Sequence, residues 1–553
     1  MTPEITTTKA VNRPFIPNYV WLAMALLAIL TYFLGLNLPL LGPDEPRYAQ
    51  VAREMFDKGD WVTPTLGGFT WFEKPALLYW LEIASYHIFG VNEFAARFGS
   101  ALFGLGTVAS LWILGRKLAT ENTEDGEDGK NVRTLPKISV LSVSSVVNSF
   151  PNYLALIAAS TLGILVFSHG ASFDINITFP ITAALVSYFI FDRSPASERR
   201  RVPASLVLFY FFIGVALLAK GLIGIIFPFA IVAFYHLLSW KVPSGIFVAS
   251  LIWGIAIALA VASIWYVPVY LRNGWPFIDE FFIQHHFQRF TTNKFQHPQP
   301  FYFFLWVLPL MTLPWLPFFV ASIWNFVREI FHHRATEGTE SASTKAPLVT
   351  REGWRTLRPM GWFSLRSPLA LFSVAWLLVP LVFFSFSGSK LPGYILPAVP
   401  AAIILTAIYL FRLVEKGRKW RIAIISLAAS VFIVAILLIL LVLPRFADTD
   451  SARGLLAAAS ERGYTTAPVY GLHTISHSAE FYAASRLLRD PDGKQKKLYS
   501  PAEVVSEMQR AGAKRALVLV PVEYQKQLTD SNLLHAEIIR DNTEIAIVAV
   551  SIE

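Results

Sequence analysis

Apolar runs long enough to cross a bilayer recur along most of this 553-residue chain, and they constrain its fold more than any other feature. A helix of about 20 residues spans the roughly 30 Å of hydrocarbon in a membrane. Hydrophobic residues make up 54% of the chain and charged residues only 15%, which is far from the balance of soluble proteins. The sequence therefore predicts a polytopic α-helical membrane protein.

The apolar runs predict eleven transmembrane helices. The first, residues 19–40, is too long for a signal-peptide core and no cleavage site of small residues follows it, so we expect it to be retained. The other ten are predicted over residues 94–118, 154–167, 175–191, 204–218, 222–238, 245–267, 301–326, 369–386, 394–411 and 422–443. The number rises to thirteen if residues 138–147 insert and if residues 75–90, which we expect to lie along the membrane surface, insert as well.

Loop charge predicts the orientation of these helices. Basic clusters at residues 199–201, 351–366 and 412–421 alternate along the chain on the same side as the N-terminal tail, and the positive-inside rule makes that side cytoplasmic. The opposite side receives residues 41–93, the turns at Asp174 and Lys220, residues 272–300, residues 385–394 and everything after Pro444. The polar motifs of the chain are therefore predicted to gather on one non-cytoplasmic face.

The last part of the chain, residues 445–553, has the hydropathy of a soluble protein. Helices are predicted over residues 451–462, 478–488 and 501–512, and β-branched runs predict buried strands over residues 516–521 and 544–551. We therefore expect two domains: a transmembrane catalytic domain over residues 1–444, with its first outer loop at 41–93, and a small α/β domain outside the membrane.

Three acidic sites stand out on the predicted outer face. Asp44 and Glu45 follow the first apolar run, Glu73 precedes Lys74 between an aromatic residue and a proline, and Asp174 lies at the mouth of a predicted helix. A carboxylate at these places can accept a proton or a hydrogen bond from a substrate. The alternative for Asp44 and Glu45 is the first turn of a surface helix, for Glu73 an ion pair with Lys74, and for Asp174 an N-cap.

A metal site has weak support in this sequence. The chain has no cysteine, so thiolate sites and disulfides are excluded. Residues 272–300 hold His285, His286 and His297, but no two histidines of this segment are spaced by four residues as in a zinc-binding helix. One of these imidazoles together with Glu73 would make a sparse site for a divalent metal.

Basic residues on the same face are suited to bind a phosphate or pyrophosphate group, and this prediction has more support than the metal site. They are Lys74, Lys220, Arg289, Lys294 and Lys390. The alternative for each is that it extends to the lipid head groups. Because the chain carries no glycine-rich phosphate loop, HExxH or nucleophile-elbow motif, a nucleotide cofactor has no support, and a lipid-borne substrate is favoured.

Several motifs between residues 41 and 401 resemble one family. GPDEPRYA, FEKPALLYW, AKGLIGIIFP, the HFQRF and FQHPQPFYFF segments and SGSKLPGYILPAVPA are similar, in this order, to motifs of the bacterial ArnT-type transferases. These enzymes move 4-amino-4-deoxy-L-arabinose from undecaprenyl phosphate onto lipid A, and they belong to the GT-C class with the protein O-mannosyltransferases. The acidic segment at residues 121–130 and the C-terminal domain depart from the pattern.

The resemblance implies an inverting glycosyltransferase in the bacterial inner membrane with a periplasmic active site and a polyprenyl phosphate–sugar donor. It implies that Asp44 is the catalytic carboxylate and Asp174 a second acid, that Lys74 contacts the donor phosphate, and that Glu73 with His285 matches a metal-associated pair. Other candidate site residues in the matched motifs are Glu45, Arg47, Tyr48, Tyr79 and Tyr394.

Two alternatives to this function stay open. A related transferase could act on another glycolipid or on a protein, as the O-mannosyltransferases do. A transporter or flippase would need polar groups at the bilayer midplane and usually two matching halves, neither of which is apparent here. We expect a monomer whose partners are the lipid donor, lipid A or another glycolipid acceptor and the surrounding membrane lipids, with no nucleic acid.

Overall fold

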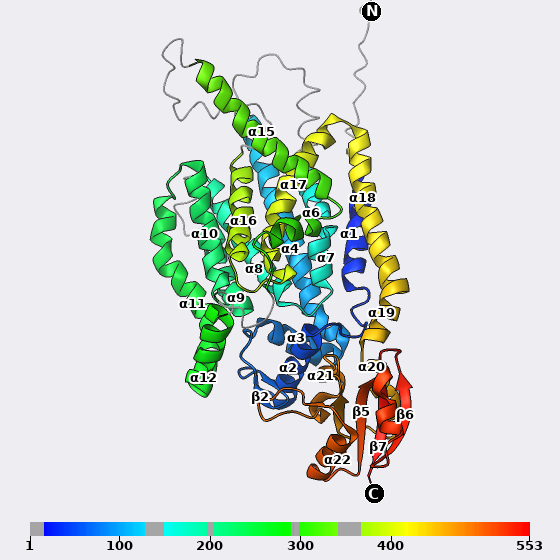
Figure 1. The fold of residues 1–553 in the computed structure, drawn as a ribbon. Helices are drawn as coiled ribbons and strands as arrows, with labels where there is room; N and C mark the ends of the chain where they lie inside the picture. Colours follow the sequence, from blue (N-terminus) through cyan, green and yellow to red (C-terminus); the bar gives the residue numbers. More distant parts are fainter. Residues whose placement is uncertain are drawn as a thin grey trace, which may run out of the picture.

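The structure is a computed structural model that describes residues 16–127, 149–195, 204–288, 291, 298–340 and 367–552. Long helices lie side by side in a bundle, and a small domain that contains a β-sheet lies beyond one end of it (Figure 1). The predicted fold class, a polytopic helical membrane protein with a small C-terminal α/β domain, is confirmed.

Six helical segments among the described residues are long and apolar enough to cross a membrane. They are α4 (Glu93–Glu127), α8 (Phe173–Arg193), α11 (Gly245–Asn273), α16 (Pro368–Ser385), α17 (Val399–Lys416) with the turn η4 (Pro392–Ala398) before it, and α18 (Arg418–Leu437), which continues through η5 (Leu438–Val442) and α19 (Leu443–Asp450). Three shorter apolar helices accompany them, α1 (Asn18–Phe33), α9 (Ala204–Lys220) and α10 (Ile223–Ser239).

Two further predicted spans are each broken into a bent pair of helices. The pairs are α6 (Phe150–Ala159) with α7 (Leu162–Ser168), bent by 57°, and α14 (Phe303–Met311) with α15 (Leu316–Glu340), bent by 119°. The two breaks contact each other, because Leu162 N–H donates to the carbonyl of Leu313 at 2.8 Å and Trp315 Nε1 donates to Ser160 Oγ at 3.2 Å. These bonds give partners to groups at the breaks, as the interior of a membrane requires.

All eleven predicted apolar runs are therefore helical, but fewer than eleven pass as full crossings. At most eight do so among the described residues, when each bent pair is taken as one span. The three short helices have 16 or 17 residues, which falls below the usual length for about 30 Å of hydrocarbon. Residues 138–147, 199–201 and 351–366, which entered the predictions of helix number and orientation, lie outside the described residues.

The first outer loop is an ordered cap on the bundle (Figure 1). It contains α2 (Asp44–Lys58), the hairpin of β1 (Thr65–Leu66) and β2 (Phe69–Thr70), and α3 (Leu77–Phe89), the helix expected at the membrane surface. Asp44 and Glu45 form the first turn of α2, where negative charge is favoured by the helix dipole. The helix ends at Gly59, whose φ of +64° is a left-handed conformation that glycine adopts without steric cost.

Residues 272–300, expected to be a loop, contain helical structure. The segment holds α12 (Trp275–Phe277) and the π-helical turn η2 (Ile278–Gln288). The rings of Phe277 and Phe281 pack against Trp265 of α11 with centroids 5.5 and 6.0 Å apart, and Phe277 also meets Phe72 of the first loop at 5.4 Å. Aromatic packing thus orders a stretch whose charged residues favoured an irregular loop.

The C-terminal domain contains a five-stranded sheet in the order β4-β3-β5-β7-β6. The strands are β3 (Val469–Leu472), β4 (Lys497–Leu498), β5 (Arg515–Pro521), β6 (His535–Asp541) and β7 (Ile545–Ser551), and the helices are α20 (Arg453–Glu461), α21 (Ala479–Tyr482), α22 (Pro501–Arg510) and α23 (Lys526–Thr529), with the 3-10 turns η6 (Ala484–Arg486) and η7 (Val522–Tyr524). Strands β3, β4 and β5 are parallel, whereas β7 is antiparallel to β5 and β6.

Most of the predicted elements of this domain are confirmed. The predicted helix at residues 478–488 is shorter than expected, because it consists of α21 and the turn η6. Strands β3, β4 and β6 were not predicted: β4 has two residues, and β6 is an edge strand with mostly exposed residues and no clear apolar alternation. The predicted domain boundary at residues 444–445 lies within α19.

The C-terminal domain is bonded to the first outer loop. Tyr482 of α21 donates its hydroxyl proton to Glu93 at 2.9 Å and accepts a hydrogen bond from the backbone N–H of Leu40 at 2.9 Å. Arg453 forms an ion pair with the same Glu93 at 3.2 Å. The domain therefore lies against the end of the bundle where the predicted polar face is found (Figure 1).

Candidate active site

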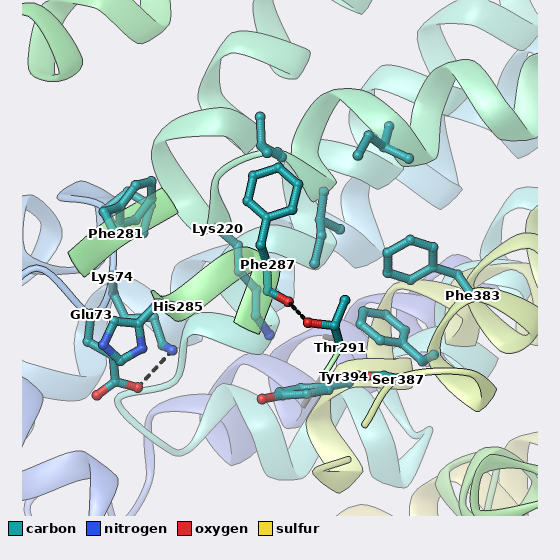
Figure 2. A pocket seen from close by; sticks show the side chains of 15 residues that line it. Glu73, Lys74, Lys220, Phe281, His285, Phe287, Thr291, Phe383, Ser387 and Tyr394 are labelled. Carbon is teal, nitrogen blue, oxygen red and sulfur yellow. Dashed lines mark hydrogen bonds and ion pairs between the residues drawn. The ribbon is translucent and has the colours of Figure 1, made fainter. Parts of the chain in front are cut away.

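A cavity of about 280 Å³ lies where the first outer loop, the turn between α9 and α10, η2 and the turn after α16 come together. Its polar lining residues are Glu73, Lys74, Lys220, His285, Thr291, Ser387 and Tyr394. Its apolar lining residues are Pro75, Leu222, Ile223, Ile226, Phe281, Phe287, Phe383 and Phe384. Figure 2 shows Glu73, Lys74 and His285 together at one side of the cavity and Phe383 at the other.

The turn that carries Glu73 and Lys74 is held at the cavity by its neighbours. Lys74 Nζ lies 2.9 Å from Glu73 Oε1, and both side chains are largely buried. The backbone N–H of Phe72 donates to Glu280 Oε1 at 3.1 Å, which ties this turn to η2. The ion pair that was considered as an alternative is thus present, and it also lines the cavity.

Lys220 and Asp174 form a second pair at the cavity. Lys220 is the last residue of α9, and its ammonium donates to the carboxylate of Asp174 in the first turn of α8. The same ammonium lies 4.6 Å from the centroid of the Tyr394 ring. The N-cap of α8 is Ser172, not Asp174, so the N-cap alternative for Asp174 does not hold.

The surroundings of Gly393 explain why the KLPGY motif has a glycine at this position. A Cβ atom at this position would lie 1.8 Å from Asp174 Oδ2 and 2.7 Å from the Phe167 ring. The backbone of η4 must therefore approach the carboxylate of Asp174 more closely than any side chain allows. This close approach brings Tyr394 next to Lys220.

Asp44 lies beside the cavity and does not line it. Its carboxylate accepts a hydrogen bond from Arg47 at 2.5 Å, and its side chain is 49% exposed. Burial alone would lower the pKa of Arg47, but the negative charges of Glu73 and Asp44 raise it above its usual value. Asp44, Arg47 and Glu73 therefore lie close enough for both carboxylates to interact electrostatically with the guanidinium.

Two buried tyrosines, Tyr48 and Tyr79, interact with the same charged groups. Burial raises the pKa of Tyr48 and Tyr79 well above the usual value, and the charge of Glu73 raises both further. Tyr79 is fully buried, and its hydroxyl has no hydrogen-bond partner among the described residues. Arg47, Tyr48 and Tyr79, predicted as site residues from their motifs, are thus brought together near Asp44 and Glu73.

Glu45 has a different place from the one predicted. Its carboxylate forms an ion pair with Arg97 at 2.7 Å and accepts hydrogen bonds from the backbone N–H groups of Leu41 and Ala171. Arg97 also donates to three backbone carbonyls in the segment that follows α1, those of residues 36, 38 and 39. Glu45 therefore fastens the first loop to the bundle and does not face the cavity.

Arg97 was not predicted as a functional residue, although the sequence contains a signal for it. Arg97 lies in the first turns of an apolar span, where an ionisable residue needs a partner. Its partner Glu45 lies 52 residues away in the chain, so spacing alone could not identify the pair.

Lys390 does not line the cavity. Its ammonium donates to the backbone carbonyls of Ser387 at 2.6 Å and Gln299 at 3.0 Å. Burial lowers the pKa of Lys390. In this structure Lys390 thus holds a turn together, because its ammonium donates to two backbone carbonyls.

Part of the predicted site falls outside the described residues. Arg289 and Lys294, predicted to bind the donor phosphate, are among them, as are the side chains of His286 and His297. Within the described part of the chain, no three His, Asp or Glu side chains are grouped closely enough to hold a metal ion. Glu73 and His285 line the same cavity and could supply two ligands.

The chain matches two family models, each over less than half of its length. A model described as "6-pyruvoyl-tetrahydropterin synthase related domain; membrane protein" matches residues 152–329, and one described as "Dolichyl-phosphate-mannose-protein mannosyltransferase" matches residues 18–123. The second match covers the first helix and the whole first outer loop.

Curated relatives give longer matches. The undecaprenyl phosphate-alpha-4-amino-4-deoxy-L-arabinose arabinosyl transferase of Aeromonas salmonicida is 29% identical over 399 residues, which is 72% of this chain and 61% of the relative. The protein of the same name from Yersinia enterocolitica is 30% identical over 400 residues, 70% of this chain and 58% of the relative. The chain thus spans about three fifths of the length of the curated relatives it matches.

Solved structures match nearly the whole chain. ArnT from Cupriavidus metallidurans bound to undecaprenyl phosphate has a TM-score of 0.72 at 20% identity, covering 96% of this chain and 98% of that one. The same protein in the apo state has a TM-score of 0.70. This chain therefore has the fold of ArnT, and along about seven tenths of its length its sequence is similar to the arabinosyl transferases, as its motifs predicted.

Proposed function

We propose that this chain transfers a sugar, 4-amino-4-deoxy-L-arabinose, from undecaprenyl phosphate to lipid A. We place the reaction at the periplasmic face of the bacterial inner membrane and expect the protein to act as a monomer. The names of the curated relatives and the ligand of the ArnT structure support the donor. The described connection between α17 and α18, which is flanked by basic residues in the sequence, lies at the end of the bundle opposite α2 and α3 of the first outer loop (Figure 1), which supports the sidedness.

This proposal rests mainly on the cavity. It joins two lysines, Lys74 and Lys220, to a wall of aliphatic and aromatic side chains from α10 and α16. A polyprenyl phosphate has a charged head and an apolar chain, so it needs cations and an apolar surface in one space. A transporter would instead need polar groups at the bilayer midplane, whereas these groups lie near helix ends.

The chemistry follows from the residues around the cavity. The bond between the anomeric carbon and a phosphate oxygen breaks, and an acceptor oxygen forms the new bond to that carbon. Negative charge grows on the departing phosphate, and Lys74 and Lys220 are in position to stabilise it. If the acceptor group is a hydroxyl, Asp44 takes its proton as a general base; if it is a phosphate, which is already ionised, Asp44 positions it through Arg47.

We also propose that Glu73 and His285 hold a divalent cation against the donor phosphate. Protein sites for catalytic zinc usually have three protein ligands, so oxygen atoms of the phosphate would have to complete this one. The cation would supply positive charge for the leaving group. Metal content of the purified protein, measured by mass spectrometry with and without undecaprenyl phosphate, tests this: Glu73→Gln should lose the bound metal, and a metal-free wild-type protein with the lipid bound would contradict it.

A second candidate acceptor, another glycolipid or a protein, has support from one observation. The mannosyltransferase family model matches residues 18–123, which include Asp44, Glu73 and Lys74. Since both acceptor types would use the same donor cavity, the cavity does not discriminate between them.

The test is mass spectrometry of lipid A and total glycolipids from a host that lacks its own transferase. We expect an aminopentose increment on lipid A in cells with the wild-type protein and with Lys241→Gln, which changes an exposed lysine just after α10. Asp44→Asn and Lys74→Gln should abolish the increment while the proteins remain folded in the membrane. Unmodified lipid A in cells that contain the folded wild-type protein would overturn the proposed acceptor.

A further inference from the structure

Three ring-bearing residues of the C-terminal domain follow the carboxyl ends of three neighbouring parallel strands. His473 comes directly after β3, Tyr499 directly after β4, and Tyr524 ends the turn η7 that follows β5. The chain passes from β3 to β4 on one side and then returns to β5 on the other side of β3. In α/β sheets ligands bind beyond the carboxyl ends of the strands at such a switch in direction.

The three rings form one partly exposed cluster. The centroids of His473 and Tyr524 are 4.4 Å apart with 32° between the ring planes, and those of His473 and Tyr499 are 5.9 Å apart with 78° between the planes. Tyr499 is 58% exposed and Tyr524 37% exposed. Aromatic side chains that stay this exposed next to one another at the end of a sheet offer an apolar surface to a ligand.

Polar groups surround the rings. His473 Nε2 lies 2.9 Å from Gln527 Oε1, and Lys497 Nζ lies 5.4 Å from the centroid of the Tyr499 ring. The backbone of His473 has a φ of +58°, which is uncommon for a residue with a side chain. Such a conformation persists where the surrounding structure requires it and is frequent at ligand sites.

The cluster lies at the end of the sheet that faces the bundle. The β6–β7 turn, which adjoins the carboxyl end of β5, is bonded to the end of α19 by Asn542, whose amide donates to the carbonyl of Thr449 at 2.8 Å. His477 follows His473 by four residues, so their Cα atoms are at most about 14 Å apart. Helix α21, which begins two residues after His477, is bonded to α2, because Arg53 donates to the backbone carbonyl of Phe481 at 3.4 Å. The segment around His477 therefore lies next to the helix that begins with Asp44, and burial lowers the pKa of His477 while the charge of Arg47 lowers it further.

We propose that His473, Tyr499 and Tyr524 form a saccharide-binding subsite that holds the sugar part of the acceptor. Aromatic rings have a negative face that attracts the polarised C–H groups on one face of a sugar ring. Gln527, Lys497 and the tyrosine hydroxyls offer hydrogen bonds to the hydroxyl or phosphate groups at its edge. The role in presenting an acceptor to Asp44 rests on the proposed function; the binding of a saccharide does not.

Binding is tested with the full-length protein in lipid nanodiscs and a deacylated glucosamine disaccharide as the probe, by isothermal titration calorimetry. We expect saturable binding by the wild-type protein and a loss of about tenfold in affinity for each of Tyr499→Ala and Tyr524→Ala. Tyr499→Phe should keep most of the affinity because the ring remains. Leu533→Ala, which truncates a side chain 58% exposed in the same domain, serves as the control and should bind like the wild type.

Two outcomes would overturn the subsite: no saturable binding of the disaccharide, or equal binding by the wild type and both alanine variants. Kinetics separate this failure from failure of the proposed function. If the wild type modifies lipid A, Tyr499→Ala should raise KM for the acceptor about tenfold and leave KM for the donor unchanged. If the disaccharide binds through the tyrosines but no lipid A is modified, the subsite stands and the proposed acceptor fails.

Discussion

Lys220 at the end of α9 forms an ion pair with Asp174 at the start of α8, 46 residues earlier in the chain. Lys74 is likewise paired with Glu73 at the same cavity. Each cavity lysine among the described residues thus has a carboxylate beside it, and the site is close to neutral before a phosphate enters. An entering phosphate must compete with these carboxylates for the lysine donors, which predicts opposite effects from removing the two members of a pair.

Lys220→Gln should weaken the binding of undecaprenyl phosphate by about tenfold to a hundredfold, because a hydrogen bond between charged groups contributes roughly 1.5–3 kcal/mol. Asp174→Asn should strengthen binding of the lipid, because it leaves the Lys220 charge without its carboxylate, and should lower turnover, because Lys220 loses its position. Binding of the radiolabelled lipid to purified protein in detergent measures both. Lys241→Gln is the control, and equal affinities for the wild type and Lys220→Gln would contradict the assignment.

Gly393→Ala should lower turnover at least about tenfold. The new methyl group would need space that the carboxylate of Asp174 and the ring of Phe167 occupy, so the Asp174–Lys220 pair must shift, and a small misplacement in an active site can cost a hundredfold in rate. Initial rates of sugar transfer by purified protein measure the effect.

Gly245→Ala at the start of α11 is a matched control, since a Cβ there would meet no atom within 4 Å. If Gly393→Ala and Gly245→Ala are equally active, the close approach of η4 to Asp174 does not matter for function.

The apolar helices and the polar site at Glu73 and Lys74 could be predicted from the sequence, whereas the helical structure within residues 272–300 could not. Glu73 and Lys74 are adjacent in the chain, and their place outside an apolar helix predicted a polar site. Lys220 was predicted as a phosphate ligand, but its partner Asp174 could not be identified, because the contact depends on how α8 and α9 pack. Lys390 was also predicted as a phosphate ligand from its charge, and only the folded turn reveals the two backbone carbonyls to which its ammonium donates.

Glu45 shows why neighbouring residues in one motif can have different roles. Asp44 and Glu45 are adjacent on α2, so helical geometry turns their side chains about 100° apart. One reaches Arg47 near the cavity, and the other reaches Arg97 in the bundle. Composition and spacing do not distinguish the two acids, whereas the burial of their side chains in the folded protein does.

Glu45→Gln should destabilise the protein by about 3–5 kcal/mol, because it leaves the buried Arg97 guanidinium without its counter-charge. Burial alone would raise the pKa of Glu45, but Arg97 outweighs it and the pKa of Glu45 is lowered. This stabilisation is therefore complete above the unfolded pKa of about 4.3 and is lost as the pH falls through the folded value. Thermal unfolding in detergent measures the change.

The control for this variant is Glu537→Gln, which breaks an exposed ion pair with Arg462 and should cost about 0–1 kcal/mol. If the two variants unfold at the same temperature at pH 7, the Glu45–Arg97 pair contributes no more than a surface ion pair.

Glu82 should have the opposite dependence on pH. It lies on α3 with 1% of its surface exposed, and neither carboxylate oxygen has a hydrogen-bond partner among the described residues. Burial raises the pKa of Glu82 well above its usual value, and the negative charge of Glu45 raises it further. The folded protein therefore keeps the proton at pH values where the unfolded chain has released it, and the stability falls as the pH rises above the unfolded pKa of about 4.3.

Glu82→Gln should remove this loss, because glutamine has nearly the same shape and no proton to release. We expect the variant and the wild type to unfold at similar temperatures near pH 4.5 and the variant to become the more stable one as the pH rises to 8. The difference in unfolding free energy should grow by roughly 1.4 kcal/mol for each pH unit up to the folded pKa. Parallel unfolding curves over this range, or a less stable variant at pH 8, would mean that Glu82 is ionised in the folded protein and that its charge is stabilised there.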